Sequence, residues 1–294
     1  MTQQRTWFVT GAGRGLGRAF VVAALEVGDR VAATARTPAV LDDLAAAYGD
    51  QLVVLPLDVT DRSAVVRTVA EAHGRLGRLD VVVNNAGYGQ IGAIEELAED
   101  EVRRQLDTNL LGAIWVSQAA LPYLRAQGGG HVVQISTVGA VGTLPLFGLY
   151  NASKWGLEGF SSAMADEVAP FGIHVTMAQL GGFATDWAGT SMAFAEGAIA
   201  AYAPVREAVL GMPSYPDAAA ADAAAAGDAD DAAADEPPEV AAAALLALVA
   251  QPAPPRRVII GRGAHEMVAT ALAWRRDEYA RDPAFTWPAA PETW

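Results

Sequence analysis

Seven short apolar segments recur along this chain of 294 residues and constrain its fold more than any other feature. A near-continuous apolar run such as 79–83 is typical of a parallel strand that is covered on both faces. Helical patterns alternate with these segments, and 52% hydrophobic residues suffice for one large core. We therefore predict a single α/β domain with a doubly wound parallel sheet of about seven strands and helices on both faces. The expected strands are residues 7–10, 30–35, 52–57, 79–83, 131–135, 173–178 and 257–260.

The first strand leads into a glycine turn, residues 10–17, and residues 18–27 beyond it have the pattern of a helix. Glycines let a backbone approach a phosphate closely, and the N–H groups and dipole of the helix favour an anion. The common dinucleotide fingerprint would place another glycine at Leu16. We expect a Rossmann-like site for a dinucleotide here, and the alternative is a glycine turn without a ligand. The expected contacts are Gly11, Arg14, Gly15, Leu16 and Gly17.

The end of the second strand predicts which dinucleotide binds. In a doubly wound sheet the adenosine ribose lies at this point, and a carboxylate there repels a 2′-phosphate. This chain has Arg36 instead, and Arg14 in the glycine turn adds a second cation suited to a phosphate. NADP(H) is therefore the expected cofactor, unless both arginines are ordinary solvated residues.

Two further strands end in polar residues that point to the same cofactor. Asp58, followed by Val59, comes at the end of the third strand, where its carboxylate can accept from the adenine amino group. The alternative is that Asp58 or Asp61 caps the next helix. The fourth strand runs into residues 84–87, Asn-Asn-Ala-Gly, which can brace the sheet and leave room for a flat ring. Asn85, Ala86 and Gly87 are the expected cofactor contacts.

A rare lysine marks the region of expected chemistry. Of the 20 basic residues only Lys154 is a lysine, which indicates a role that arginine cannot fill. If residues 147–169 form a helix, Tyr150 and Lys154 lie one turn apart on one face of it. Ser136 closes the strand before it. Asn109, one of four asparagines, lies inside a predicted helix at 100–117, which indicates either a specific hydrogen bond or a solvent-facing side chain without a role.

Composition excludes several classes of protein. The net charge of −14 argues against a nucleic-acid partner, and the chain has no cysteine for disulfides or thiolate metal sites. The four histidines lie far apart and have no ligand spacing, so no metal is expected. The first residues lack a signal-peptide core and no apolar span is long enough to cross a bilayer, so we expect a cytoplasmic protein without membrane insertion.

The last third of the chain is more irregular. Residues 182–212 are expected to be helical in character and to form a substrate lid, with bulky side chains that either roof a pocket or pack in the core. Residues 213–239 contain eight of the acidic residues and no basic one, so the rest of the chain carries −14 + 8 = −6. We expect a mobile surface insertion there. Helices are expected at 240–250 and 265–281, and the tail 282–294 packs either on a neighbour or on its own domain.

Five of these motifs, in order and correctly spaced over about residues 5–190, resemble the short-chain dehydrogenase/reductase family. They are the turn at 10–17, Asn-Asn-Ala-Gly at 84–87, Asn109, Ser136 and the Tyr-x-x-x-Lys of 150–154. One departure is Leu180, because the family has proline before Gly181, and a less constrained backbone at the nicotinamide is expected from it. Thr185, which in the family bonds the carboxamide or phosphate, is present.

The resemblance implies an NADP-dependent enzyme that interconverts a carbonyl and an alcohol, active as a homodimer or homotetramer. Tyr150 would exchange the proton, helped by the Lys154 ammonium, which favours the phenolate and also holds the nicotinamide ribose. Ser136 would hold the substrate oxygen, and Asn109 would anchor a water that links Lys154 to solvent. The alternatives are an NADP-binding sensor or scaffold without turnover, and a non-redox or epimerising relative.

The substrate is expected to be a lipophilic small molecule. This prediction rests on the apolar bias of the side chains that we expect around the pocket. They are Tyr88, Gln90, Leu144, Phe147, Trp187 and Met192.

Overall fold

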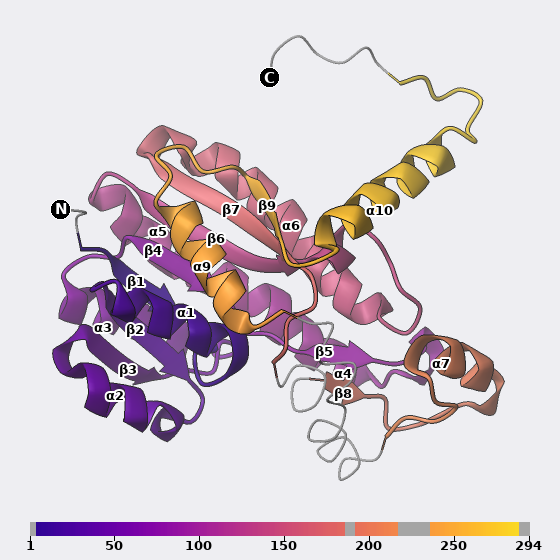
Figure 1. Cartoon of the computed structure of the whole chain (residues 1–294), viewed down its shortest axis with the longest axis horizontal. Helices are drawn as coiled ribbons and strands as arrows, with labels where there is room; N and C mark the ends of the chain where they lie inside the picture. Colours follow the sequence, from indigo (N-terminus) through magenta and orange to yellow (C-terminus); the bar gives the residue numbers. More distant parts are fainter. Residues whose placement is uncertain (1–3, 186–191, 217–235, 288–294) are drawn as a thin grey trace.

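Apolar strands build the centre of the molecule, which a computed structural model describes for residues 4–185, 192–216 and 236–287 (Figure 1). In these residues seven parallel strands form one sheet in the order β3-β2-β1-β4-β6-β7-β9. All four residues of β1 are buried, as expected where helices cover both faces. The strands are β1 Thr6–Val9, β2 Arg30–Ala35, β3 Leu52–Pro56, β4 Val81–Asn84, β6 Gly130–Thr137, β7 Ile173–Leu180 and β9 Arg257–Ile260.

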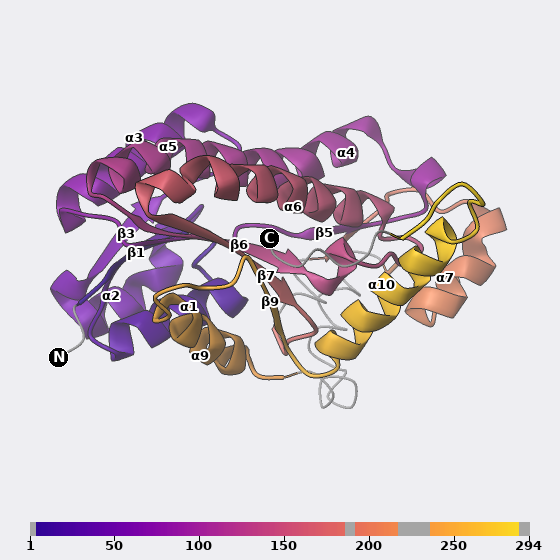
Figure 2. The ribbon, with the colours of Figure 1, turned by 90° about the horizontal axis from the view of Figure 1, so that it is seen from above.

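Helices cover the sheet on both sides (Figure 2). One core cluster joins the sheet to α1, α2 and α9, and the other joins its opposite face to α3, α5 and α6. This is the predicted doubly wound α/β fold. The helices are α1 Gly15–Glu26, α2 Asp42–Tyr48, α3 Arg62–Leu76, α4 Glu99–Leu106, α5 Gly112–Ala126, α6 Gly148–Val168, α7 Ala203–Leu210, α9 Pro238–Val249 and α10 Ala264–Tyr279.

The structure corrects the expectation of helical character throughout 182–212. Met192–Phe194 forms a short strand, β8, which pairs in parallel with an unpredicted strand, β5, at Gly89–Ile91. A helix, α7, follows only at Ala203. Short segments such as these adopt strand geometry because they find a partner far away in the sequence, which local patterns do not reveal.

The chain leaves the sheet after β7 and returns to the same place before α9. Phe183 forms a parallel bridge with Glu236, and the N–H of Ala184 donates to the carbonyl of Glu236 at 2.8 Å. The Glu236 carboxylate also accepts from the N–H of Arg262 at 2.7 Å. The two ends of the stretch 185–235 therefore lie side by side. Most of the predicted acidic insertion, residues 217–235, is outside the described residues.

The predicted C-terminal helix is α10, which leaves the sheet at the end of β9 and extends away from it (Figure 1). In the described part of the tail, the ring of Phe285 lies 5.3 Å from that of Tyr279 and 5.0 Å from that of Trp287, and all three side chains are exposed. No helix in the described ranges has the length and hydropathy needed to span a bilayer.

Candidate active site

A cavity of about 1800 Å³ runs along the carboxyl ends of the strands, where doubly wound sheets bind their ligands. Nearly every residue singled out from the sequence lines it. They are Gly11, Arg14, Gly15, Leu16, Gly17, Arg36, Asp58, Val59, Asn85, Ala86, Gly87, Tyr88, Gln90, Ser136, Leu144, Phe147, Tyr150, Lys154, Thr185 and Met192. Asn109 lies behind the wall, and Trp187 is outside the described residues.

The glycine turn has the shape of a phosphate cradle. Gly11 has φ +64°, and a Cβ there would lie 2.8 Å from the Cα of Ala86. A Cβ at Gly17 would lie 2.2 Å from the carbonyl oxygen of Gly11, so no larger residue fits the first turn of α1. The Asn85 side chain donates to the carbonyls of Thr10 and Gly11 at 3.0 and 3.1 Å and so braces the turn against β4. A cofactor phosphate fits this cradle at the N-terminus of α1.

Both predicted arginines, Arg14 and Arg36, face the cavity beside this turn. Of the two acidic residues after β3, Asp61 takes the capping role that the sequence left open between them. Asp61 caps α3 by accepting from the N–H of Ala64 at 2.9 Å. Asp58 lines the cavity, and its carboxylate accepts from the N–H and hydroxyl of Thr60 at 2.9 and 2.8 Å.

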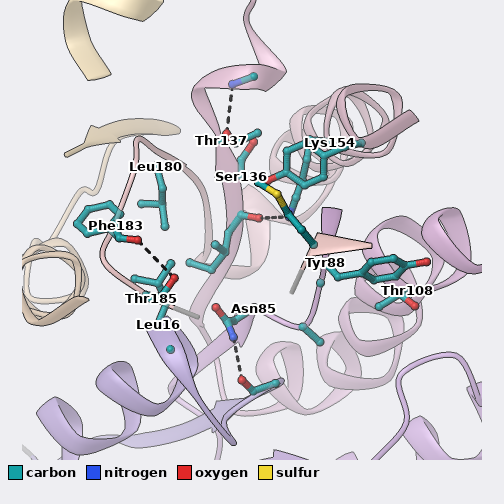
Figure 3. Close-up of a pocket in the computed structure, with 18 of the residues that line it drawn as sticks. Leu16, Asn85, Tyr88, Thr108, Ser136, Thr137, Lys154, Leu180, Phe183 and Thr185 are labelled. Carbon is teal, nitrogen blue, oxygen red and sulfur yellow. Dashed lines mark hydrogen bonds between the residues drawn. The ribbon is translucent and has the colours of Figure 1, made fainter. Parts of the chain in front are cut away.

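Helix α6 carries Tyr150 and Lys154 one turn apart, and both line the cavity, where Figure 3 labels Lys154. The Lys154 Nζ is 5.9 Å from the centroid of the Tyr150 ring and donates to the carbonyl of Ile135 at 2.8 Å. Only 6% of Lys154 is exposed. The ammonium is therefore held between α6 and β6 and does not reach into solvent.

The structure corrects the assignment of Ser136. Its hydroxyl donates to the carboxylate of Glu158 at 2.9 Å and is buried. The next residue, Thr137, forms the hydrogen bond with the Tyr150 phenol, and its hydroxyl also accepts from the N–H of Gly139 at 3.2 Å (Figure 3). Adjacent residues in a strand point to opposite faces, so only one of the two hydroxyls can meet Tyr150. The sequence contains both and does not reveal which face the strand presents.

Burial controls the ionisation of the pair on α6. It raises the pKa of Tyr150 to about 12, although the hydrogen bond from Thr137 lowers it. It also lowers the pKa of Lys154 to about 8. The expected stabilisation of the phenolate by the lysine is thus overcome by desolvation, and at neutral pH the Tyr150 phenol is protonated and able to act as an acid.

Asn109 makes specific hydrogen bonds and does not face solvent. It lies in a π-helical turn, Asp107–Leu111, between α4 and α5 and is 1% exposed. Its amide exchanges hydrogen bonds with the backbone of Tyr88, at 3.0 and 2.8 Å, and donates to the Ser153 hydroxyl at 3.2 Å. A Cβ at Gly87 would lie 3.1 Å from Asn109 Oδ1 and 3.7 Å from Lys154 Nζ, so the two side chains meet at this glycine. Single-turn π segments of this kind are frequent at functional sites.

Leu180 does not loosen the backbone at the end of β7, in contrast to the expectation. It pairs with Thr137 of β6 on one side and with Ile260 of β9 on the other. Its side chain is buried, and the N–H of Gly181 donates to the carbonyl of Ile260 at 2.9 Å. Thr185 follows and lies against the glycine turn, because a Cβ at Gly15 would be 3.5 Å from it.

The described part of the predicted substrate lid, which lies within residues 192–216, is fastened to the loop after β5 by a buried ion pair. Arg206 of α7 meets the Glu96 carboxylate at 2.5 Å, and the two side chains are 2% and 0% exposed. Arg206 also donates to the carbonyls of Pro213 and Ile199 at 2.7 and 3.0 Å. The Tyr215 hydroxyl completes the cluster by donating to Glu96. Of the bulky side chains discussed for this segment, Met192 lines the cavity, and Phe194 and Tyr202 pack in a small core beside it.

Comparison with known proteins agrees with the geometry. Residues 5–195 match the short chain dehydrogenase family. The chain is 46% identical over 189 residues to the oxidoreductase BOA17 of Botryotinia fuckeliana, covering 64% of this chain and 69% of that protein. It is 37% identical over 183 residues to the 3-ketodihydrosphingosine reductase of Bacteroides thetaiotaomicron, covering 62% and 65% of the two chains.

A solved structure extends the likeness to the whole fold. A short-chain dehydrogenase from Streptomyces avermitilis superposes with a TM-score of 0.83 at 35% identity and covers 96% of this chain and 97% of its own. This chain therefore belongs to the short-chain dehydrogenase/reductase family, whose members are oxidoreductases that use NAD(H) or NADP(H).

Proposed function

We propose that this protein is an NADP(H)-dependent reductase that interconverts a lipophilic ketone or aldehyde and its alcohol. The observation that carries the proposal is the hydrogen bond between Thr137 and the Tyr150 phenol, one helical turn from Lys154, in the cavity that the glycine turn also lines. Both members of this pair are hydroxyl groups, which suit a neutral carbonyl oxygen.

The residues divide the work of reduction as follows. The bound nicotinamide supplies the hydride to the carbonyl carbon. Tyr150 gives the proton of its Oη to the oxygen, and Thr137 donates a hydrogen bond to the same oxygen as its charge develops. Lys154 holds a positive charge beside the phenolate that remains and, by resemblance to the family, binds the ribose. A water anchored by the π-helical turn at Asn109 would return the proton to Tyr150. Because the Asn109 side-chain amide already bonds to Tyr88, we propose that a backbone carbonyl of that turn accepts the hydrogen bond from this water.

The experiment that tests this function follows NADPH absorbance with a panel of neutral ketones and aldehydes, and repeats it with NADH. Turnover with NADPH supports the proposal, and the largest rates are expected with uncharged apolar compounds. Tight NADPH binding without turnover across the panel would instead indicate a sensor or scaffold. Preference for a highly charged substrate would contradict the expected lipophilic pocket.

The cofactor preference is predicted to depend on Arg36. Its replacement by aspartate removes a charged hydrogen bond to the 2′-phosphate and adds repulsion, so kcat/KM with NADPH should fall by about 10- to 100-fold while NADH is used as well or better. Arg67→Asp makes the same charge change at an exposed site on α3 outside the cavity. It should leave the ratio of kcat/KM with NADPH to kcat/KM with NADH unchanged. An unchanged preference in Arg36→Asp would assign the phosphate to other groups.

Thr137 is predicted to matter for catalysis and Ser136 for stability. Thr137→Val keeps the shape of the side chain but removes the hydroxyl, so kcat should fall by about 10²-fold with little change in NADPH affinity. Ser136→Ala removes the bond to Glu158 and should lower the free energy of unfolding by about 1 kcal/mol, with kcat nearly unchanged. Steady-state kinetics and urea unfolding of both variants decide the matter, and the reverse pattern would restore Ser136 to the catalytic role.

A further inference from the structure

Helix α10 has a face that the core does not use. Only Ala264 and Val268 of this helix are buried. A different stripe, with residues recurring every three or four positions, lines the same cavity as Tyr150. Its members are Gly263, Glu266, Met267, Thr270, Ala271 and Trp274. The helix runs outward from the sheet (Figure 1), and the stripe along it lines the cavity from Gly263 to Trp274.

The outer part of this stripe is apolar and accessible. Met267 and Trp274 are 56% and 68% exposed, and Leu144, which also lines the cavity, is 49% exposed. The one charged member, Glu266, lies in the first turn of α10, near the end of β9. Beyond it the stripe offers only Met267, Thr270, Ala271 and Trp274, so its chemistry suits an uncharged hydrocarbon and no anion or cation.

This wall is held in place by contacts that the catalytic proposal does not use. Arg275 donates to the carbonyl of Val141 at 2.5 Å, and its guanidinium lies 4.4 Å from the centroid of the Trp155 ring on α6. The Trp155 indole donates to the carbonyl of Gly139 at 3.1 Å. A Cβ at Gly142 would lie 3.1 Å from that of Ala271, which shows how closely α10 approaches this segment. The stripe therefore has a fixed position relative to Thr137 and Tyr150.

The size of the cavity leaves room for a long occupant. At about 1800 Å³ it exceeds the ~300–1,000 Å³ of a site for one small ligand, so it has room for a cofactor and a substrate together. The glycine turn lines the part of the cavity proposed for the cofactor, and the α10 stripe lines it next to the segment that holds Gly142 and Leu144, with Ala271 close to Gly142. A chain attached to the carbonyl at Tyr150 would run along this stripe.

We propose that the α10 stripe is the binding channel for an extended, uncharged alkyl tail on the carbonyl substrate, and that Ala271 and Trp274 determine the chain length the protein accepts. This inference rests on the proposed function, which it deepens by naming long-chain aliphatic carbonyl compounds as the substrate class. The apolar tail covers the exposed Met267 and Trp274 side chains, and the carbonyl carbon reaches the groups on α6 and β6.

The test measures kcat/KM with NADPH for 2-butanone, 2-hexanone, 2-octanone and 2-dodecanone. In the unmodified protein each methylene that reaches the channel should raise kcat/KM by up to about fourfold, the factor that corresponds to ~0.8 kcal/mol per buried methylene. Ala271→Phe fills the channel, so kcat/KM for the longer ketones should fall by about tenfold or more. The kcat/KM for 2-butanone should be unaffected. Trp274→Ala is a second variant that removes the outer wall and should weaken only 2-dodecanone.

The matched control is Ala269→Phe, the same substitution at an exposed position of α10 that does not line the cavity. It should behave as the unmodified protein. An effect equal to that of Ala271→Phe would show that the helix, and not the channel, is disturbed, and would overturn the proposal. So would a kcat/KM that does not depend on chain length.

A binding measurement separates this inference from the proposed function. Titration calorimetry with 1-dodecanol and the protein loaded with NADP⁺ should show binding that Ala271→Phe abolishes. Binding of this kind without reduction of any alkanone would sustain the channel and reject the reductase. Turnover of short ketones without binding of dodecanol would reject the channel alone, and failure of both measurements would reject both. A changed oligomeric state of Ala271→Phe in size-exclusion chromatography, with an unchanged chain-length profile, would assign the stripe to a second copy and overturn the channel.

Discussion

Replacement of Tyr150 by phenylalanine is expected to lower kcat for carbonyl reduction by about 10²- to 10⁴-fold, the range that a positioned general acid contributes. The phenylalanine ring keeps the shape of the site but lacks the Oη that meets Thr137. Burial keeps the phenol protonated at neutral pH, so the lost group is the proton donor itself. Lys154 cannot substitute, because its ammonium is bound to the carbonyl of Ile135.

The measurement is steady-state NADPH oxidation together with NADPH affinity by fluorescence titration. Affinity should remain within about threefold, because only the reacting group has changed. Tyr48→Phe makes the same substitution in α2, remote from the cavity, and should have full activity. Undiminished turnover by Tyr150→Phe would remove the tyrosine from the mechanism and with it the proposed assignment of roles.

The second large effect is expected on stability. Arg206→Met leaves the Glu96 carboxylate buried without its cation, and the removal of one partner of such a pair destabilises by about 3–5 kcal/mol. The loss also frees the carbonyls of Pro213 and Ile199. Because these contacts join α7 to the loop after β5, the amide protons of α7 should exchange faster and the KM for long substrates should rise.

An exposed ion pair supplies the control. Arg103 and Glu99 on α4 are 72% and 80% exposed, so Arg103→Met should change the free energy of unfolding by less than about 0.5 kcal/mol. Hydrogen exchange followed by mass spectrometry, with urea unfolding, compares the two variants. Equal effects, or unchanged exchange in α7, would show that the buried pair does not hold the lid.

The fold was predictable because its signals are local. The strand at 30–35 and the last strand at 257–260 are apolar runs with clear ends, and the structure gives both the same bounds. The pair β5 and β8 could not be predicted, because each is three residues long and gains strand geometry only from the other. Patterns of apolar residues report which face of an element is buried, and they do not report a distant partner.

Most of the cavity lining was predictable from the sequence, and the difference at Ser136 has a clear origin. Ser136 and Thr137 are both hydroxyl residues at the end of one strand, and the orientation of β6 against α6 decides which meets Tyr150. The π-helical turn at Asn109 could not be predicted either. A poor helix former inside a helix indicates that the position is unusual, but it does not indicate a π-helical turn. The α10 stripe was missed because its residues are unremarkable until the helix is placed beside the cavity.

The bridge between Phe183 and Glu236 divides the chain into two parts that can change independently in evolution. The glycine turn, Thr137, Tyr150 and Lys154 belong to the framework outside this bridge, whereas residues 192–216 lie between its two adjoining ends. Lengthening a closed loop adds only about 0.6 kcal/mol for each doubling, so this stretch can be extended with little penalty to the framework as long as the Arg206–Glu96 pair is kept. Chimaeras that swap 186–235 between relatives and keep an arginine at position 206 should therefore inherit a new substrate repertoire and keep the parent's hydride chemistry.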